Sequence, residues 1–220
     1  MASEEALHAS DAGVRDLHPG ASVWGGGAAP YAIVSKKLGM WLFIVSDAIT
    51  FASLLFAYTY VRVASVQWPM PFHVWPSIAN ATLMTFVLLS SSLTMVMAVR
   101  AAKAGSRTQV VRWLSATIVG GLAFIILHAR EWLGLIDEGV RLFRNPWGTP
   151  LFGAAFFGLT GLHMTHVGIG VIYLGIVALG QGFGKFKAED VEVSGLYWHF
   201  VDLVWMFIFP LVYLMSARLG

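Results

Sequence analysis

The chain has 220 residues, of which 57% are hydrophobic and only 12% are charged, with a mean hydropathy of +0.71. A soluble domain carries about 25% charged residues, so the composition excludes an ordinary soluble protein and indicates an integral membrane protein. The absence of cysteine excludes disulfides, thiolate catalysis and cysteine-ligated metal sites, and a net charge of +2 gives no reason to expect nucleic acid as a partner.

Residues 1–35 are predicted to form an N-terminal arm that is mobile or bound to a partner. The stretch is polar and then rich in small residues (WGGGAAP), and it lacks the basic and then apolar pattern of a cleaved signal peptide. Residues 36–220 are predicted to form one membrane domain.

Five apolar segments in that domain are long enough to cross a bilayer, whose hydrocarbon core of about 30 Å needs about 20 helical residues. They lie at about residues 38–61, 76–99, 113–136, 151–179 and 196–216. The predicted fold class is therefore an all-α integral membrane protein, a bundle of five transmembrane helices.

The first three segments differ in their polar content. Asp47 lies near the middle of the first segment, close to the bilayer midplane. The second segment has no charge, but its hydroxyl and amide groups can hydrogen-bond to neighbouring helices. These residues are Asn80, Thr82, Thr85, Ser90, Ser91, Ser92 and Thr94. The third segment carries His128, Arg130 and Glu131 as one group near its far end, where Glu131 is expected to be hydrogen-bonded or ion-paired.

The last two segments carry paired polar residues. His163 and His166 lie three apart in the fourth segment, and His199 and Asp202 lie three apart in the fifth, so each pair shares a helix face. Counted from the ends of the segments, both pairs fall in the inner half of the membrane, near the depth of Asp47. Ionisable groups at this depth face protein or water, so these five side chains are expected to share one layer between neighbouring helices.

The loop charges predict that the N-terminus is inside and the C-terminus outside. Five segments put the termini on opposite sides, and cytoplasmic loops carry an excess of Lys and Arg. This orientation places nine basic residues inside: Arg15, Lys36, Lys37, Arg100, Lys103, Arg107, Arg112, Lys185 and Lys187. It places five outside: Arg62, Arg130, Arg141, Arg144 and Arg218.

From the residues alone, three interpretations of the polar layer stay open. The layer forms a proton or ion route, a histidine pair on different helices ligates haem, or the polar groups are structural. His163 and His166 share a helix face, so they cannot supply both axial ligands of one haem. They can share a metal, with Asp47 or Asp202 completing the site.

Four strings in order along the chain resemble subunit III of the haem–copper respiratory oxidases, over Leu38 to Tyr213. They are LGMWLFIVSDAITF with Asp47, HAREW with His128 and Glu131, GLHMTHVGIGVIYL with His163 and His166, and GLYWHFVDLVW with Trp198, His199 and Asp202. The family's carboxylate in the first string is usually Glu in cytochrome c oxidases, and Asp47 matches the quinol-oxidase relatives.

The resemblance implies a non-catalytic subunit III of an aerobic terminal oxidase of the cytochrome c oxidase type. Such a chain binds no haem or copper itself, because these cofactors belong to its partners, subunits I and II. The resemblance also implies structural phospholipid and a buried carboxylate, Asp47, that supports proton uptake. A lipid-contacting or structural polar network is expected from Glu131, His128, His163, His166, Trp198, His199 and Asp202.

Larger members of the family have seven helices, with a lipid-filled cleft after the first two, so this chain resembles the five-helix form. Extra helices of subunit I are then expected to take the place of the missing pair. The family also implies location in a prokaryotic cytoplasmic (inner) membrane. A respiratory supercomplex is a further assembly that the resemblance allows.

Alternatives within the superfamily are a quinol oxidase subunit III and an accessory subunit of nitric oxide reductase. Alternatives of a different class are a haem-binding membrane anchor and a small proton-coupled carrier. A carrier is expected to show inverted internal repeats, and none is evident in the sequence.

Overall fold

The computed structural model describes residues 35–218, so the predicted N-terminal arm lies outside the described residues except for Ser35. The long helices are α2 (Ser35–Ala64), α3 (Ala79–Lys103), α4 (Arg107–Asp137), α5 (Pro150–Gly182) and α6 (Ala188–Ile208). Short turns η1 (Val74–Ile78), η2 (Phe209–Tyr213) and η3 (Leu214–Ser216) extend α3 and α6. Strands β1 (Phe72–His73) and β2 (Ala217–Arg218) pair in parallel.

Five helices of the described part are long and apolar enough to cross a membrane, which confirms the predicted fold class. Each helix extends past the apolar segment drawn from the sequence at one end or both, most of all α6, which begins at Ala188 rather than near residue 196. Helix α6 itself ends at Ile208, and η2 and η3 continue it to Ser216, the predicted end. Acidic residues stabilise a helix N-terminus, and Asp190 caps this one by accepting a hydrogen bond from the Lys187 backbone N–H at 2.8 Å. Hydropathy alone therefore places the start of this helix too late.

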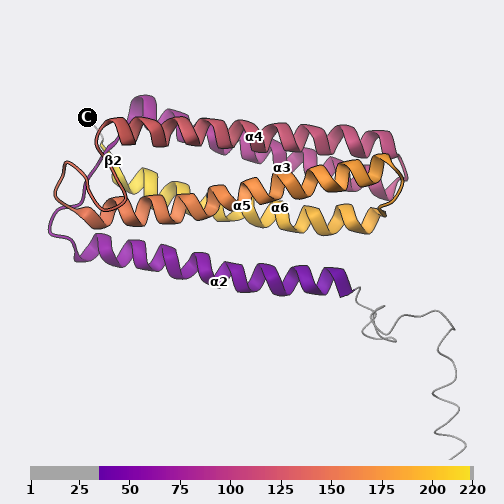
Figure 1. The fold of residues 1–220 in the computed structure, drawn as a ribbon, viewed down its shortest axis with the longest axis horizontal. Helices are drawn as coiled ribbons and strands as arrows, with labels where there is room; N and C mark the ends of the chain where they lie inside the picture. The colour runs from indigo at the N-terminus through magenta and orange to yellow at the C-terminus, as the bar shows by residue number, and fades with distance from the viewer. Residues whose placement is uncertain (1–34, 219–220) are drawn as a thin grey trace, which may run out of the picture. The chain divides into compact units, whose positions relative to one another are not determined.

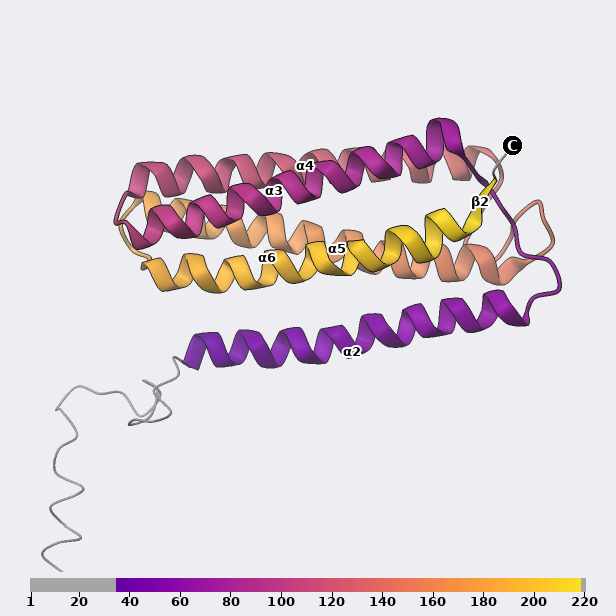
Figure 2. The same ribbon diagram turned by 180° about the vertical axis from the view of Figure 1, so that it is seen from behind.

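Residues 43–220 form one compact unit in which α3, α4, α5 and α6 make a closed ring of neighbouring helices. Each of these helices packs against the next in the chain or, for α3 and α6, against each other (Figure 1). Figure 2 shows the same ring from behind, with α6 in front and α3 beside α4. The turns from α3 to α4 and from α5 to α6 lie at one end of the ring, and the turn from α4 to α5 at the other.

From residue 43 to its end, helix α2 packs beside α5 and α6 along a narrow line of side chains. Its buried residues are Ile44, Phe51 and Tyr58, spaced by seven and therefore on one helix face. The end of α2 is joined to the end of the chain, because the Tyr58 hydroxyl and the Ser216 hydroxyl lie 3.0 Å apart. Arg62 also donates a hydrogen bond to the carbonyl of Met215. The remaining faces of α2 are largely exposed.

The centre of the ring is filled by Trp198, whose side chain is fully buried. Its indole lies against two glycines of neighbouring helices, Gly121 on α4 and Gly170 on α5. A Cβ at Gly121 would lie 2.6 Å from Trp198 Cη2, and a Cβ at Gly170 would lie 2.9 Å from Trp198 Cζ3. Only residues without a side chain allow three helices to enclose this indole.

Candidate functional site

Asp47 on α2 and His166 on α5 form a pair inside the membrane-spanning part of the structure. Asp47 Oδ2 lies 3.2 Å from His166 Nε2, and each side chain is only about one-eighth exposed, at 13% and 12%. The other ring nitrogen, Nδ1, lies 2.8 Å from the Leu162 carbonyl, where it can only donate. A proton placed on either Asp47 or Nε2 leaves the pair neutral overall, which lowers the cost of holding it at this depth.

His163 points away from this pair and into an aromatic layer inside the ring. Its imidazole stacks on Trp205 with a centroid distance of 5.4 Å and an interplanar angle of 25°. The edge of Phe124 lies 5.6 Å from the same imidazole. His163 is fully buried, so its surroundings are aromatic rather than polar.

His128 belongs to the same aromatic layer, and the prediction that it groups with Arg130 and Glu131 is wrong. Its ring lies 5.6 Å from Trp205 and 5.5 Å from Phe124, and it is fully buried. His128 continues the stripe of buried α4 residues spaced by three and four, which includes Leu114, Thr117, Gly121 and Phe124. This helical spacing points it into the ring.

The aromatic layer bears on the interpretation that a histidine pair ligates haem, as far as it concerns His128 and His163. Trp205 and Phe124 each contact both His128 and His163, so side-chain rings fill the space that a haem would need between these two histidines. Over residues 35–218, no three His, Asp or Glu side chains come together as a metal site. His163 in particular does not join the pair of Asp47 and His166.

His199 and Asp202 on α6 face α3, at a position where that helix supplies a hydroxyl group. Ser92 Oγ lies 2.6 Å from His199 Nδ1 and also faces the carboxyl of Asp202, which is 6% exposed. The five ionisable groups predicted to share one layer therefore divide among three surroundings. Asp47 pairs with His166, His163 stacks in the aromatic layer, and the α6 pair meets Ser92.

Both buried tryptophans of α6 also bond to hydroxyls of α3. Trp198 Nε1 donates to Ser91 Oγ at 3.1 Å, and Trp205 Nε1 donates to Thr85 Oγ1 at 3.0 Å. A further hydroxyl pair, Thr94 with Thr117, joins α3 to α4 at 2.8 Å. The prediction that hydroxyls of the second segment hydrogen-bond to neighbouring helices is confirmed.

Replacing Ser92 with alanine is expected to lower the free energy of unfolding by about 0.5–1.5 kcal/mol, because His199 then loses its partner. Ser90→Ala is the matched control, since Ser90 lies two residues away on the exposed face of the same helix. Unfolding of the purified chain in mixed micelles measures both. Equal losses for the two variants would contradict an interhelical role for Ser92.

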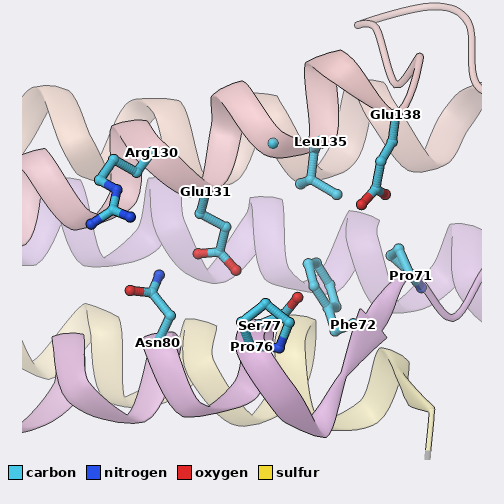
Figure 3. A pocket seen from close by; sticks show the side chains of 10 residues that line it. Pro71, Phe72, Pro76, Ser77, Asn80, Arg130, Glu131, Leu135 and Glu138 are labelled. Carbon is cyan, nitrogen blue, oxygen red and sulfur yellow. The ribbon is translucent and has the colours of Figure 1, made fainter.

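Glu131 lies at the other end of the ring, where it lines a pocket of about 260 Å³ between α4 and the start of α3. The Tyr213 hydroxyl donates a hydrogen bond to Glu131 Oε2 at 3.2 Å, so the prediction that Glu131 is hydrogen-bonded is confirmed. Figure 3 shows Arg130 and Glu131 on α4 facing Asn80 across this pocket, with Glu138, directly after α4, on the side of Phe72.

Sequence reasoning missed Tyr213 as a site residue, and it named Ser92 without its partner. Tyr213, which binds Glu131, and Ser92, which binds His199, lie 82 and 107 residues from their partners. No local pattern pairs residues so far apart. The only signal was indirect, since a hydroxyl in an apolar helix needs a partner.

Known proteins match this chain over most of its length. The family description "Cytochrome c oxidase subunit III" matches residues 5–217. The cytochrome c oxidase subunit 3 of Alkalihalophilus pseudofirmus is 33% identical over 186 residues, covering 83% of this chain and 88% of the relative. The quinol oxidase subunit 3 of Bacillus spizizenii is 34% identical over 182 residues, covering 81% and 86%.

A more distant source gives a similar match. The cytochrome c oxidase subunit 3 of the lancelet Branchiostoma lanceolatum is 35% identical over 196 residues, covering 83% of this chain but 70% of the longer relative. The family match extends over nearly the whole chain, and the five apolar helices agree with a membrane subunit. The chain therefore belongs to the cytochrome c oxidase subunit III family and is a subunit III of a haem–copper terminal oxidase.

Proposed function

We propose that the chain acts as the non-catalytic third subunit of an aerobic oxidase of the cytochrome c oxidase type. In this role it stabilises subunit I, and the haem and copper that reduce oxygen are bound by subunits I and II. One observation carries the proposal: the buried histidines His128 and His163 pack against Trp205 and Phe124 and so serve the helix core. A chain built in this way contributes contacts to the complex and leaves electron transfer to its partners.

The proposed location is the inner membrane of a prokaryote, with the N-terminus in the cytoplasm. The turns from α3 to α4 and from α5 to α6 lie at one end of the ring, and these turns and the helix ends beside them hold basic residues. These include Arg100, Lys103, Arg107, Arg112, Lys185 and Lys187. The positive-inside rule favours the cytoplasm for this end.

The proposed partners are oxidase subunits I and II together with membrane phospholipid. Helix α2 supports this, because large apolar side chains such as Ile49, Phe56 and Val63 are exposed on it by 64%, 73% and 80%. Extra helices of subunit I, or lipid, would cover these faces. The pair of Asp47 and His166 is the group proposed to support proton uptake.

A quinol oxidase subunit III is the second candidate for the complex. Relatives that carry the name quinol oxidase subunit 3 match as well as those named for cytochrome c oxidase. The Asp at position 47 also favours the quinol type through the family resemblance. The donor is bound by other subunits, so the two candidates differ in the partner and not in the role of this chain.

A pull-down of the tagged chain in mild detergent tests the proposal. The eluted complex is expected to show a reduced-minus-oxidised haem spectrum and oxygen consumption, while the chain separated from it shows no haem absorbance. Adding reduced cytochrome c or a quinol then identifies the donor. Haem that stays with the separated chain would overturn the proposal in favour of a haem-binding anchor.

A further inference from the structure

A second lipid-facing feature lies at the basic end of the ring, between α4 and α5. It is a groove of about 380 Å³, here called the α4–α5 groove. Its lining is Val111, Ser115 and Ile118 from α4, Gly175, Ala178, Leu179 and Gly182 from α5, and Phe183 directly after α5. From Val111 to Ile118 the groove runs about 10 Å along α4, at about 1.5 Å per residue.

Two of the residues that line the groove are glycines, which leave space along α5. A Cβ placed on Gly175 or Gly182 would meet no heavy atom within 4 Å, so these backbones border open space. The apolar side chains at its edge stay exposed, Leu179 by 65% and Phe183 by 76%. Seven of the eight lining residues are apolar or glycine, with Ser115 as the exception. Such a surface suits an acyl chain.

The end of the groove nearest the loops carries a positive charge. Arg107 lies one helical turn before Val111 on the same face of α4. Its guanidinium packs on Gly184, directly after Phe183, with Nη1 2.6 Å from the place of a Cβ at that glycine. The guanidinium thus lies between the start of α4 and the turn after α5, next to Phe183 of the groove.

The surrounding loops add to this charge. Residues 100–107 and 183–192 hold five basic residues, Arg100, Lys103, Arg107, Lys185 and Lys187. They hold three acidic residues, Glu189, Asp190 and Glu192. Two of these carboxylates are already engaged, because Asp190 accepts from the Lys187 backbone and Glu192 lies 3.7 Å from Lys103 Nζ. The mouth of the groove is left with an excess of positive charge.

We propose that the α4–α5 groove binds an anionic phospholipid of the membrane leaflet at this end, with its phosphate at Arg107 and one acyl chain in the groove. An apolar channel that ends at an arginine matches the two chemically different parts of such a lipid. Each basic residue near a membrane surface adds about 1 kcal/mol to the binding of an anionic lipid. This site lies at the opposite end of the ring from Glu131, on different helices from α2, and does not depend on the identity of the electron donor.

The test uses the complete chain, purified with its co-purifying subunits, stripped of lipid and titrated with dioleoyl phosphatidylglycerol. Native mass spectrometry counts the bound lipids and gives their affinity. Arg107→Gln is expected to weaken the tightest site about fivefold, the equivalent of about 1 kcal/mol. Arg112→Gln is the matched control, because Arg112 lies at the same end of α4 but lines another surface with Gln109 and Trp113. It is expected to leave the affinity unchanged.

A second pair of variants tests the groove itself. Gly175→Leu fills the groove and is expected to abolish the tightest site, while Gly168→Leu, two turns deeper on α5 and also facing open space, leaves it intact. Phosphatidylcholine with the same acyl chains is expected to bind more weakly than phosphatidylglycerol. Equal losses of affinity in Arg107→Gln and Arg112→Gln would mean that the lipid binds to a diffuse basic surface instead of a site at Arg107. Unchanged binding in Gly175→Leu, or no tight site in the wild type, would overturn the proposal.

Discussion

Gly170→Leu is expected to prevent the chain from reaching its folded state in the membrane. A Cβ at this position already lies 2.9 Å from Trp198 Cζ3 and 3.1 Å from Tyr197 Cε1, closer than carbon atoms approach without displacement. The remaining leucine carbons would enter a space that Trp198 fills, and neither α5 nor α6 can move without opening the ring. Extra volume in a packed core commonly costs about 1–3 kcal/mol, and this case is expected to reach or exceed the upper end. The measurement is the yield of folded protein after size-exclusion chromatography, together with its melting temperature.

Gly168→Leu is the matched control for this variant. It introduces the same side chain two residues away on α5, where a Cβ would meet no heavy atom within 4 Å. Its yield and melting temperature are expected to stay close to those of the wild type. If both variants fold equally well, the enclosure of Trp198 by glycines does not hold the ring together.

Asp47→Asn is expected to leave assembly and the initial rate of oxygen reduction nearly intact, while shortening severalfold the time for which the oxidase stays active. Asparagine preserves the shape of the side chain beside His166 but cannot carry the proton that the pair shares. If the pair supports proton uptake during turnover, its loss appears as progressive inactivation rather than as a slower first turnover. Oxygen consumption followed over many turnovers, at a fixed enzyme concentration, measures both quantities.

Thr50→Val is a suitable control for Asp47→Asn, because Thr50 lies three residues away on the exposed face of α2 and bonds only to its own helix, at the Ser46 carbonyl. This variant is expected to inactivate at the wild-type rate. An immediate and complete loss of activity in Asp47→Asn would assign the carboxyl a part in the chemistry itself. Inactivation at the wild-type rate would leave it a packing role alone.

Features that depend on residues close together in the chain could be predicted from the sequence. The five apolar helices follow from runs of hydrophobic residues, and Asp47 was placed at mid-depth by counting residues from the end of its span. The early start of α6 at Ala188 was missed, because Glu189 and Asp190 interrupt the hydropathy although acidic residues favour a helix N-terminus.

Side-chain contacts between different helices could not be predicted, for a different reason. His163 and His166 lie three apart on one face, yet they differ in environment because α2 reaches only one of them with a carboxylate. The spacing of buried residues on α4 gives the direction in which His128 points, into the ring. The prediction instead followed the polarity of the side chain and grouped His128 with its neighbours Arg130 and Glu131. The helical spacing gave the correct result.

The attachment of α2 to Met215 and Ser216 has a consequence for the order in which the protein is made. The residues that hold the C-terminal end of α2 are synthesised 153 and 158 residues after their partners, Arg62 and Tyr58. Strand β2 at Ala217 and Arg218 likewise follows its partner β1 by more than a hundred residues. Helix α2 therefore stays without these contacts until residues 215–218 have left the ribosome.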